Sequence, residues 1–212
     1  MVKLLGGRAA AAVIGFLMLA IGSSANAQDV AGSAASLAQP AVAVTTSQAP
    51  AASVTVKIPA AVATQAAWLY KGGWPLYAIV DKFATNAPLD EQTNCLATAV
   101  YFEARGESAE GQLAVARVVM NRAASGRYPP DWCSVVKQPA QFSFVRHGEF
   151  PYADTNSAAW QKAEAVAELA AANVVPSVSN DVLWYHADYV APTWRRSLQE
   201  VQQIGAHIFY RA

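Results

Sequence analysis

One stretch of this chain, residues 94–122, constrains the fold more than any other. It reads NCLATAVYFEARGESAEGQLAVARVVMNR. The first part predicts a helix that carries Glu103 on the same face as three apolar residues, Leu96, Ala99 and Val100. Gly106 can end this helix, and Ser108 can cap a second one. The second helix repeats apolar residues at i, i+3, i+4 spacing, namely Leu113, Ala116, Val119, Met120 and Ala123. The stretch therefore predicts two helices joined at a glycine, with a carboxyl group at the end of a buried stripe.

The position of Glu103 after buried side chains has a chemical consequence. Removal from water disfavours a charged carboxylate, so we expect burial to raise the pKa of Glu103. A carboxyl group that keeps its proton near neutral pH can act as a general acid. Glu107 and Glu110 are the nearest acids along the chain. Either could serve as a second carboxylate, and an i, i+4 pair with Glu107 would raise one pKa by like-charge repulsion.

Residues 1–27 have the pattern of a secretory signal. A positively charged start precedes an apolar run at residues 9–21, which is shorter than the ~20 residues that a membrane span needs. The small-x-small pattern at residues 25–27 is a cleavage site for this kind of signal. Residues 28–63 are rich in Ala, Pro, Ser and Thr and predict a disordered linker. We therefore expect an exported protein that has no stable membrane association once the signal is cleaved.

The chain has two cysteines, Cys95 and Cys133. An oxidising compartment favours a disulfide between them. The bond would tie the Glu103 helix to the segment after the second helix and stabilise the fold by about 3–4 kcal/mol in the chain-entropy account. The alternative is two unpaired buried thiols, because a sequence does not show whether the disulfide geometry fits.

Residues 64–89 predict an aromatic-rich arm ahead of the main domain, which we place at residues 90–212. The arm carries five rings, Trp68, Tyr70, Trp74, Tyr77 and Phe83. We expect these rings to pack against the core, and the alternative is a surface on which sugars stack.

The sequence of the later part of the main domain predicts two more helices and a small sheet. Asn156 or Ser157 can cap a helix over residues 158–173. Residues 182–186 form an apolar run typical of a strand, residues 194–203 predict a helix, and residues 204–210 predict a last strand. The fold class that follows is α+β, mostly helical, with a small β-sheet.

Two placements of side chains follow from these elements. In the helix after Ser157, Glu164 and Glu168 fall on the side opposite the apolar residues, so we expect both to be solvated. In the last strand, alternation places Tyr210 on one face, and His207 and Phe209 on the other.

Five segments occur in order along residues 90–212: YFEARGESAEGQLAVARVVMNR, YPPDWC, QFSF, WYHADYVAPTW and IGAHIFYR. Together they resemble the SleB/CwlJ type of cell-wall hydrolase, the spore-cortex-lytic family. The resemblance implies a lysozyme-like catalytic domain that cleaves the bond between N-acetylmuramic acid and N-acetylglucosamine. It implies a lytic transglycosylase in which Glu103 is both general acid and general base, and it leaves hydrolysis open as the outcome. Glu107 and Glu110 then remain as structural or pKa-tuning residues.

The same resemblance suggests which residues bind the substrate and where the protein acts. Gln141 and Ser143, in the QFSF segment, are expected to bind sugar, as are Tyr185, His186 and Trp194. Peptidoglycan glycan strands are the expected partner of a monomer in the periplasm or at the cell wall, with no cofactor and no metal. The chain has 15 basic and 15 acidic residues, a balance that argues against nucleic acid as a partner.

Three other functions stay open at this stage. Cys95 could be the nucleophile of a cysteine peptidase with His186 or His207 as its base, although a disulfide would remove that nucleophile. His147, His186 and His207 could hold zinc in an amidase, although their spacing matches no common zinc motif. The domain could also bind the cell wall without cleaving it.

Overall fold

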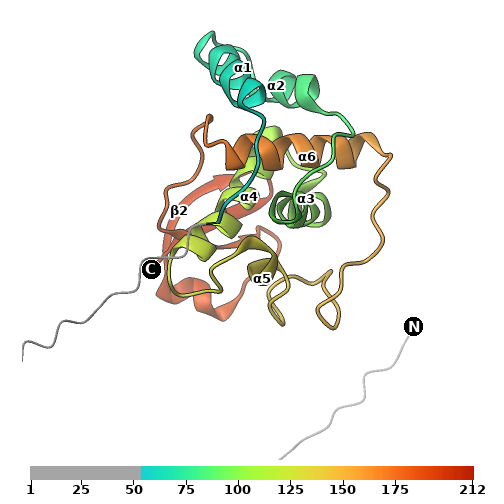
Figure 1. The fold of residues 1–212 in the computed structure, drawn as a ribbon. Helices are drawn as coiled ribbons and strands as arrows, with labels where there is room; N and C mark the ends of the chain where they lie inside the picture. The colour runs from blue at the N-terminus through green and yellow to red at the C-terminus, as the bar shows by residue number, and fades with distance from the viewer. Residues whose placement is uncertain (1–53) are drawn as a thin grey trace, which may run out of the picture. The chain divides into compact units, whose positions relative to one another are not determined.

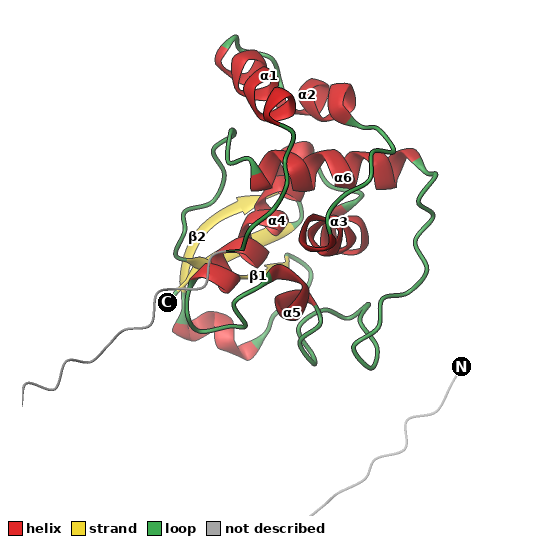
Figure 2. Ribbon diagram, viewed as in Figure 1, coloured by secondary structure: helices red, strands yellow, loops and turns green. Residues whose placement is uncertain are grey.

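The computed structural model of the chain describes residues 54–212. The predicted signal segment and residues 28–53 of the predicted linker lie outside the described residues. Within residues 54–212, none of the helices combines the length and hydropathy that a membrane crossing requires. Figures 1 and 2 show the arrangement of the described helices and strands.

Three long helices form the centre of the domain: α3 (Glu91–Ala104), α4 (Ala109–Ala124) and α6 (Ala158–Ala171). Each begins where the sequence supplies a capping side chain. Asp90, Ser108 and Ser157 each accept a hydrogen bond from the backbone N–H three residues further on, which satisfies a donor that the helix itself leaves unpaired. The predicted join between the first two helices is therefore confirmed, with α3 ending at Ala104 just before Gly106.

The α4 helix is buried on almost every side, more than its apolar ladder predicts. Met120 is only partly buried, whereas the polar residues Arg117, Asn121 and Arg122 are buried. Their side chains satisfy backbone carbonyls of the later chain. Asn121 Nδ2 donates to Val182 O at 3.0 Å, and Arg122 Nε donates to Leu183 O at 2.8 Å. These bonds attach the sheet to the helical core.

An antiparallel sheet of three strands packs beside α4, in the order β1-β3-β2 (Figure 2). Its strands are β1 (Val182–Ala187), β2 (Gln199–Ile204) and β3 (His207–Arg211). Phe209 of β3 joins Ala114 and Val118 of α4 in a small apolar cluster. The rings of His207 and Phe209 lie against Tyr185, whereas Tyr210 stacks on His186, so the predicted alternation of faces is confirmed. The mostly helical α+β class is confirmed as well.

The helix predicted over residues 194–203 is wrong. A 3₁₀ helix, η1 (Thr193–Ser197), is followed by the edge strand β2, and the last strand begins at His207 instead of residue 204. The sequence of β2, QEVQQI, has no apolar face with which to anchor a helix, and its backbone pairs with β3 instead. Gly205 has φ 58° and makes the turn between the two strands, a conformation that favours glycine.

The aromatic arm consists of two helices, α1 (Ala60–Lys71) and α2 (Leu76–Phe83). The first begins at Ala60, three residues before the predicted end of the linker at residue 63. Aliphatic residues of the pair enter the main core, namely Ala66, Leu69, Leu76, Ile79 and Val80. Most of the aromatic rings do not enter this core. Core packing is therefore the wrong expectation for four of them, because Trp68, Tyr70, Trp74 and Tyr77 are exposed; Phe83 is partly buried against the core.

A short helix, α5 (Trp132–Val136), follows the α4 helix and is joined to α3 by the predicted disulfide between Cys95 and Cys133. The bond spans 38 residues. The side chain of Gln92 supports the same junction, since its Oε1 accepts from the backbone N–H groups of Trp132 and Cys133. The disulfide prediction is confirmed.

The solvated side expected for α6 is not found. Glu168 is buried, and its pKa is raised by burial, with further contributions from Glu164 and Asp90. Glu164 is partly buried and accepts a hydrogen bond from Trp160 Nε1 at 2.7 Å. The prediction failed because the chain at the start of α3 lies beside these two residues: Glu164 shares a small cavity with Leu89 and Asn94, and the charge of Asp90 acts on Glu168. A helical wheel of α6 alone does not reveal such neighbours.

Candidate active site

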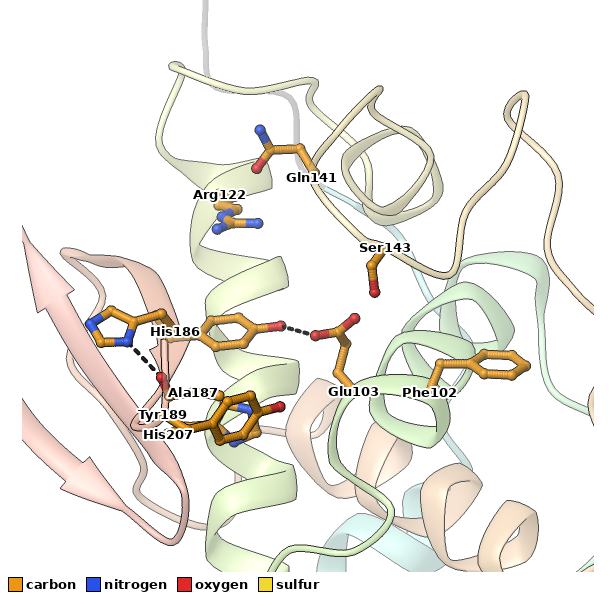
Figure 3. Close-up of a pocket in the computed structure, with 10 residues that line it drawn as sticks. Phe102, Glu103, Arg122, Gln141, Ser143, His186, Ala187, Tyr189 and His207 are labelled. Carbon is orange, nitrogen blue, oxygen red and sulfur yellow. Dashed lines mark hydrogen bonds between the residues drawn. The ribbon is translucent and has the colours of Figure 1, made fainter. Parts of the chain in front are cut away.

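A cavity of ≈ 290 Å³ lies where the end of α3, the end of α4, the loop after α5 and the sheet meet (Figure 3). Its lining is Phe102, Glu103, Arg122, Gln141, Ser143, Tyr185, His186, Ala187, Tyr189 and His207. Five of these residues were predicted as site residues. The structure brings them together from three parts of the sequence, about residues 102–122, 141–143 and 185–207.

Glu103 lies in the last turn of α3 and presents its carboxyl group to the cavity (Figure 3). Tyr185 Oη donates a hydrogen bond to Glu103 Oε2 at 3.4 Å. Burial raises the pKa of Glu103, and the Tyr185 hydrogen bond and the Arg122 charge act in the opposite direction. The expected upward direction is found, and its largest cause is the loss of water. Glu103 is the only acidic residue among the described residues that line this cavity.

Arg122 is a functional candidate that sequence reasoning placed only at the end of the second helix. Its guanidinium lies over the rings of Tyr128 and Phe142, at 5.3 and 5.8 Å from their centroids. With Nε bound to Leu183 O, the rest of the guanidinium faces the cavity. A basic residue in the last turn of a helix is common, so the sequence offers no signal that this one is buried beside Glu103.

The loop after α5 forms a polar wall of the cavity with Gln141 and Ser143, the two residues of the QFSF segment that were expected to bind sugar. Gln141 and Ser143 are exposed and line the cavity, whereas Phe142 between them is buried and packs near Phe144. In Figure 3 the hydroxyl of Ser143 points toward the carboxyl group of Glu103. Alternating exposure along this loop leaves two hydrogen-bonding side chains free to meet a ligand.

The sheet supplies the opposite wall, with one exception to the prediction. Tyr185 is bonded to Glu103, and burial raises its pKa. His186 lines the cavity, but its Nε2 is 3.0 Å from Tyr210 Oη and its Nδ1 is 2.8 Å from Ala187 O. Trp194 does not line the cavity. It packs edge-on against His186 and Tyr210, so it supports the wall from behind.

Glu107 and Glu110 do not reach the cavity. The i, i+4 pair predicted for Glu103 and Glu107 does not form, because α3 ends at Ala104 and the chain turns before Glu107. Glu107 Oε2 instead accepts a hydrogen bond from Ala206 N at 3.1 Å, and a Cβ atom at Gly205 would overlap that oxygen. Glu107 therefore holds the β2–β3 turn, which agrees with a structural role. Glu110 is exposed and lines a second cavity.

His207, the first residue of β3, is buried and lines the cavity. Its Nδ1 has no hydrogen-bond partner among residues 54–212 and lies 3.9 Å from Glu107 Oε1. Burial lowers its pKa, against the pull of the Glu107 and Asp188 charges. Three more residues line the cavity that were not predicted from the sequence, namely Phe102, Ala187 and Tyr189.

The structure also bears on the alternative functions. Cys95 is held in the disulfide, so the peptidase hypothesis loses its nucleophile. His147 is exposed on a loop and does not line the cavity that His186 and His207 share. Among residues 54–212, no three His, Cys, Asp or Glu side chains form a group that could hold a metal ion.

Comparison with known proteins shows which proteins the domain resembles. Residues 106–210 match the family described as Cell Wall Hydrolase, a match that begins three residues after Glu103. The chain is 33% identical over 138 residues to the spore cortex-lytic enzyme of Oceanobacillus iheyensis, covering 65% of this chain and 46% of the relative. It is 33% identical over 132 residues to the spore cortex-lytic enzyme of Bacillus subtilis, covering 61% and 41%. The chain thus spans less than half the length of these curated relatives.

Among solved structures, the catalytic domain of the germination-specific lytic transglycosylase SleB from Bacillus anthracis aligns with a TM-score of 0.47 and 29% identity. The alignment covers 60% of this chain and 99% of that one. By the family match, residues 106–210 of this chain are similar to the cell wall hydrolase family.

Proposed function

We propose that this protein cleaves the glycosidic bond between N-acetylmuramic acid and N-acetylglucosamine in peptidoglycan, as a lytic transglycosylase. The observation that carries the proposal is the single carboxyl group in the cavity, Glu103, whose pKa burial raises. The family of the domain and the spore cortex-lytic relatives support a substrate in the cell wall.

The number of carboxyl groups favours transglycosylation over hydrolysis. Most glycoside hydrolases use two carboxyl groups that flank the bond. A transglycosylase needs one, because the attacking group is the C6 hydroxyl of the muramic acid itself. Within residues 54–212, Glu103 is the only acid that lines this cavity, and Glu107 accepts a hydrogen bond from the backbone N–H of Ala206.

In the proposed reaction, protonated Glu103 first gives its proton to the bridging oxygen, and the bond from that oxygen to C1 of muramic acid breaks. The resulting carboxylate then accepts the proton of the C6 hydroxyl as its oxygen bonds to C1 and closes a 1,6-anhydro ring. Glu103 ends protonated again, and no water is consumed. Tyr185 and Arg122 stabilise the carboxylate between the two proton transfers, since both favour the charged form.

The remaining lining has roles that follow from its chemistry. Gln141 and Ser143 can exchange hydrogen bonds with hydroxyl and N-acetyl groups of the sugars. His186 is already bonded on both ring nitrogens, so we assign it to holding the wall. We further propose that the protein works outside the cytoplasm, in the periplasm or at the cell wall, where an oxidising environment supports its disulfide.

The test is digestion of purified peptidoglycan followed by mass spectrometry of the fragments. Wild-type protein is expected to release anhydro-muropeptides. Glu103→Gln keeps the size of the side chain but removes the proton source, so turnover is expected to fall by about 100-fold or more. Thermal unfolding of the variant shows whether the fold is retained.

Glu91→Gln is the matched control, because Glu91 is an exposed acid in the first turn of the same helix and does not line the cavity. New reducing ends in place of anhydro products would show hydrolysis, and free amino groups on intact glycan would show a peptidase or amidase. Full activity of Glu103→Gln would overturn the assignment of the catalytic residue.

A further inference from the structure

A second cavity, of ≈ 350 Å³, opens between the α1–α2 turn and the end of β2. It is lined by Tyr70, Trp74, Pro75, Leu76, Glu110, Leu113, Val175, Pro176, Ser177, Gln202 and Ile204. Its aromatic residues lie outside the part of the chain that matches the cell wall hydrolase family. It shares no lining residue with the Glu103 cavity.

The two rings at this cavity are exposed although their neighbours are buried. Trp74 is 48% exposed and Tyr70 is 37% exposed, whereas Leu76 and Leu113 in the same lining are buried. The α1–α2 turn fixes the position of Trp74, because Trp74 N donates to Leu69 O at 3.1 Å and Gly73 adopts φ 81°. A rigidly held aromatic residue that remains in water offers a flat apolar face to a ligand at little entropic cost.

Polar groups stand beside the rings. The Oγ of Ser177 is buried and has no hydrogen-bond partner in this structure. Gln202 and Glu110 are exposed and belong to the same lining. An aromatic face next to polar side chains suits a sugar ring, which has apolar C–H faces and a polar rim.

We propose that this cavity is a second glycan-binding site, which holds an N-acetylated amino sugar of the peptidoglycan strand away from the bond being cut. Charge favours the glycan over the peptides of the cell wall. Among the described residues that line the cavity, Glu110 is the only charged one, and it repels the carboxylates of an acidic stem peptide.

The position of the cavity explains how it can serve the enzyme. Ile204 lines the second cavity and His207 lines the first, at the two ends of the turn that Glu107 holds against the helices. Both sites are therefore fixed to the same turn. Binding at the second site keeps the enzyme on its polymer between cuts, an advantage that rests on the proposed function.

The test uses the full chain with Glu103→Gln, so that bound glycan stays intact and the result does not depend on turnover. Binding to purified peptidoglycan is measured by co-sedimentation. Trp74→Ala in this background is expected to weaken binding by about threefold to tenfold, the loss of one aromatic contact. Trp68→Ala is the matched control, because Trp68 is 71% exposed on α1 and does not line the cavity; its binding is expected to be unchanged.

A second measurement identifies the ligand. The indole N–H signal of Trp74, assigned by its absence in Trp74→Ala, is followed by NMR as a soluble tetramer of N-acetylglucosamine is added, and a shift is expected. Equal binding by Trp74→Ala and Trp68→Ala, with matching thermal unfolding of both, would overturn the proposal. So would a Trp74 signal that responds to free stem peptide or to anionic vesicles but not to the tetramer.

Discussion

At the scale of single residues, the proposed reaction depends on how the two protonation states of the Glu103 carboxyl group are balanced. Burial raises its pKa, while the hydroxyl of Tyr185 and the charge of Arg122 stabilise the carboxylate form. A group that must give a proton and later accept one needs both influences, since either form alone would block one of the two steps.

Tyr185→Phe tests this balance. The change removes the hydrogen bond that lowers the pKa of Glu103, so the carboxyl group stays protonated to higher pH. The basic limb of the pH–activity profile is expected to move to higher pH. The profile of initial rates on peptidoglycan measures it, and a limb that stays in place or moves to lower pH would contradict the role given to Tyr185.

At the scale of elements, the disulfide and the Gln92 side chain join α3, which carries Glu103, to α5. The loop after α5 then carries Gln141 and Ser143 into the cavity. The disulfide therefore stabilises a junction between the helix that carries Glu103 and the loop that carries Gln141 and Ser143.

Reduction of the Cys95–Cys133 bond is expected to cost about 3–4 kcal/mol, because the free chain regains the entropy of an open loop. For a domain of this size the unfolding temperature should fall by about 10 °C. Thermal unfolding with and without a reducing agent measures the effect. The double variant Cys95→Ala/Cys133→Ala provides the control, since added reductant should not change its unfolding temperature. An equal unfolding temperature for the reduced and the oxidised wild-type protein would contradict a stabilising role for the disulfide.

At the scale of the whole molecule, the folded unit extends beyond the predicted start of the catalytic domain at residue 90. Leu69 of α1 and Ile79 of α2 are buried in the same core as the central helices α3, α4 and α6. The helix pair that carries Trp74 is thus held by the core of the catalytic domain.

Ile79→Ala tests whether the helix pair α1–α2 unfolds together with the rest of the domain. Ile79 is fully buried, and removing its side chain is expected to cost the whole domain about 2–5 kcal/mol. Unfolding in denaturant, followed by the fluorescence of tryptophans inside and outside the helix pair, should show one shifted transition. Tyr77→Ala in the same helix is the control, because an exposed ring contributes little to stability. A separate early transition for the helix pair, with the remainder unshifted, would contradict a shared core.

Local rules in the sequence were sufficient for the central helices and for the burial of the Glu103 carboxyl group. Asp90, Ser108 and Ser157 mark helix starts because their side chains satisfy backbone groups a few residues away. The buried face that leads to Glu103 is likewise a matter of 3.6-residue spacing. The pairing of Cys95 with Cys133 followed from there being two cysteines and an exported chain.

Contacts between distant residues were decided by the tertiary structure alone. Tyr185 meets Glu103 across 82 positions, and Ala206 meets Glu107 across 99. Residues 199–204 form a strand because β3 supplies the partner, and Trp74 stays exposed because only the aliphatic side of its helix pair fits the core. Periodicity shows which face of an element is apolar. Which neighbour covers that face, or whether any does, is decided by the tertiary packing.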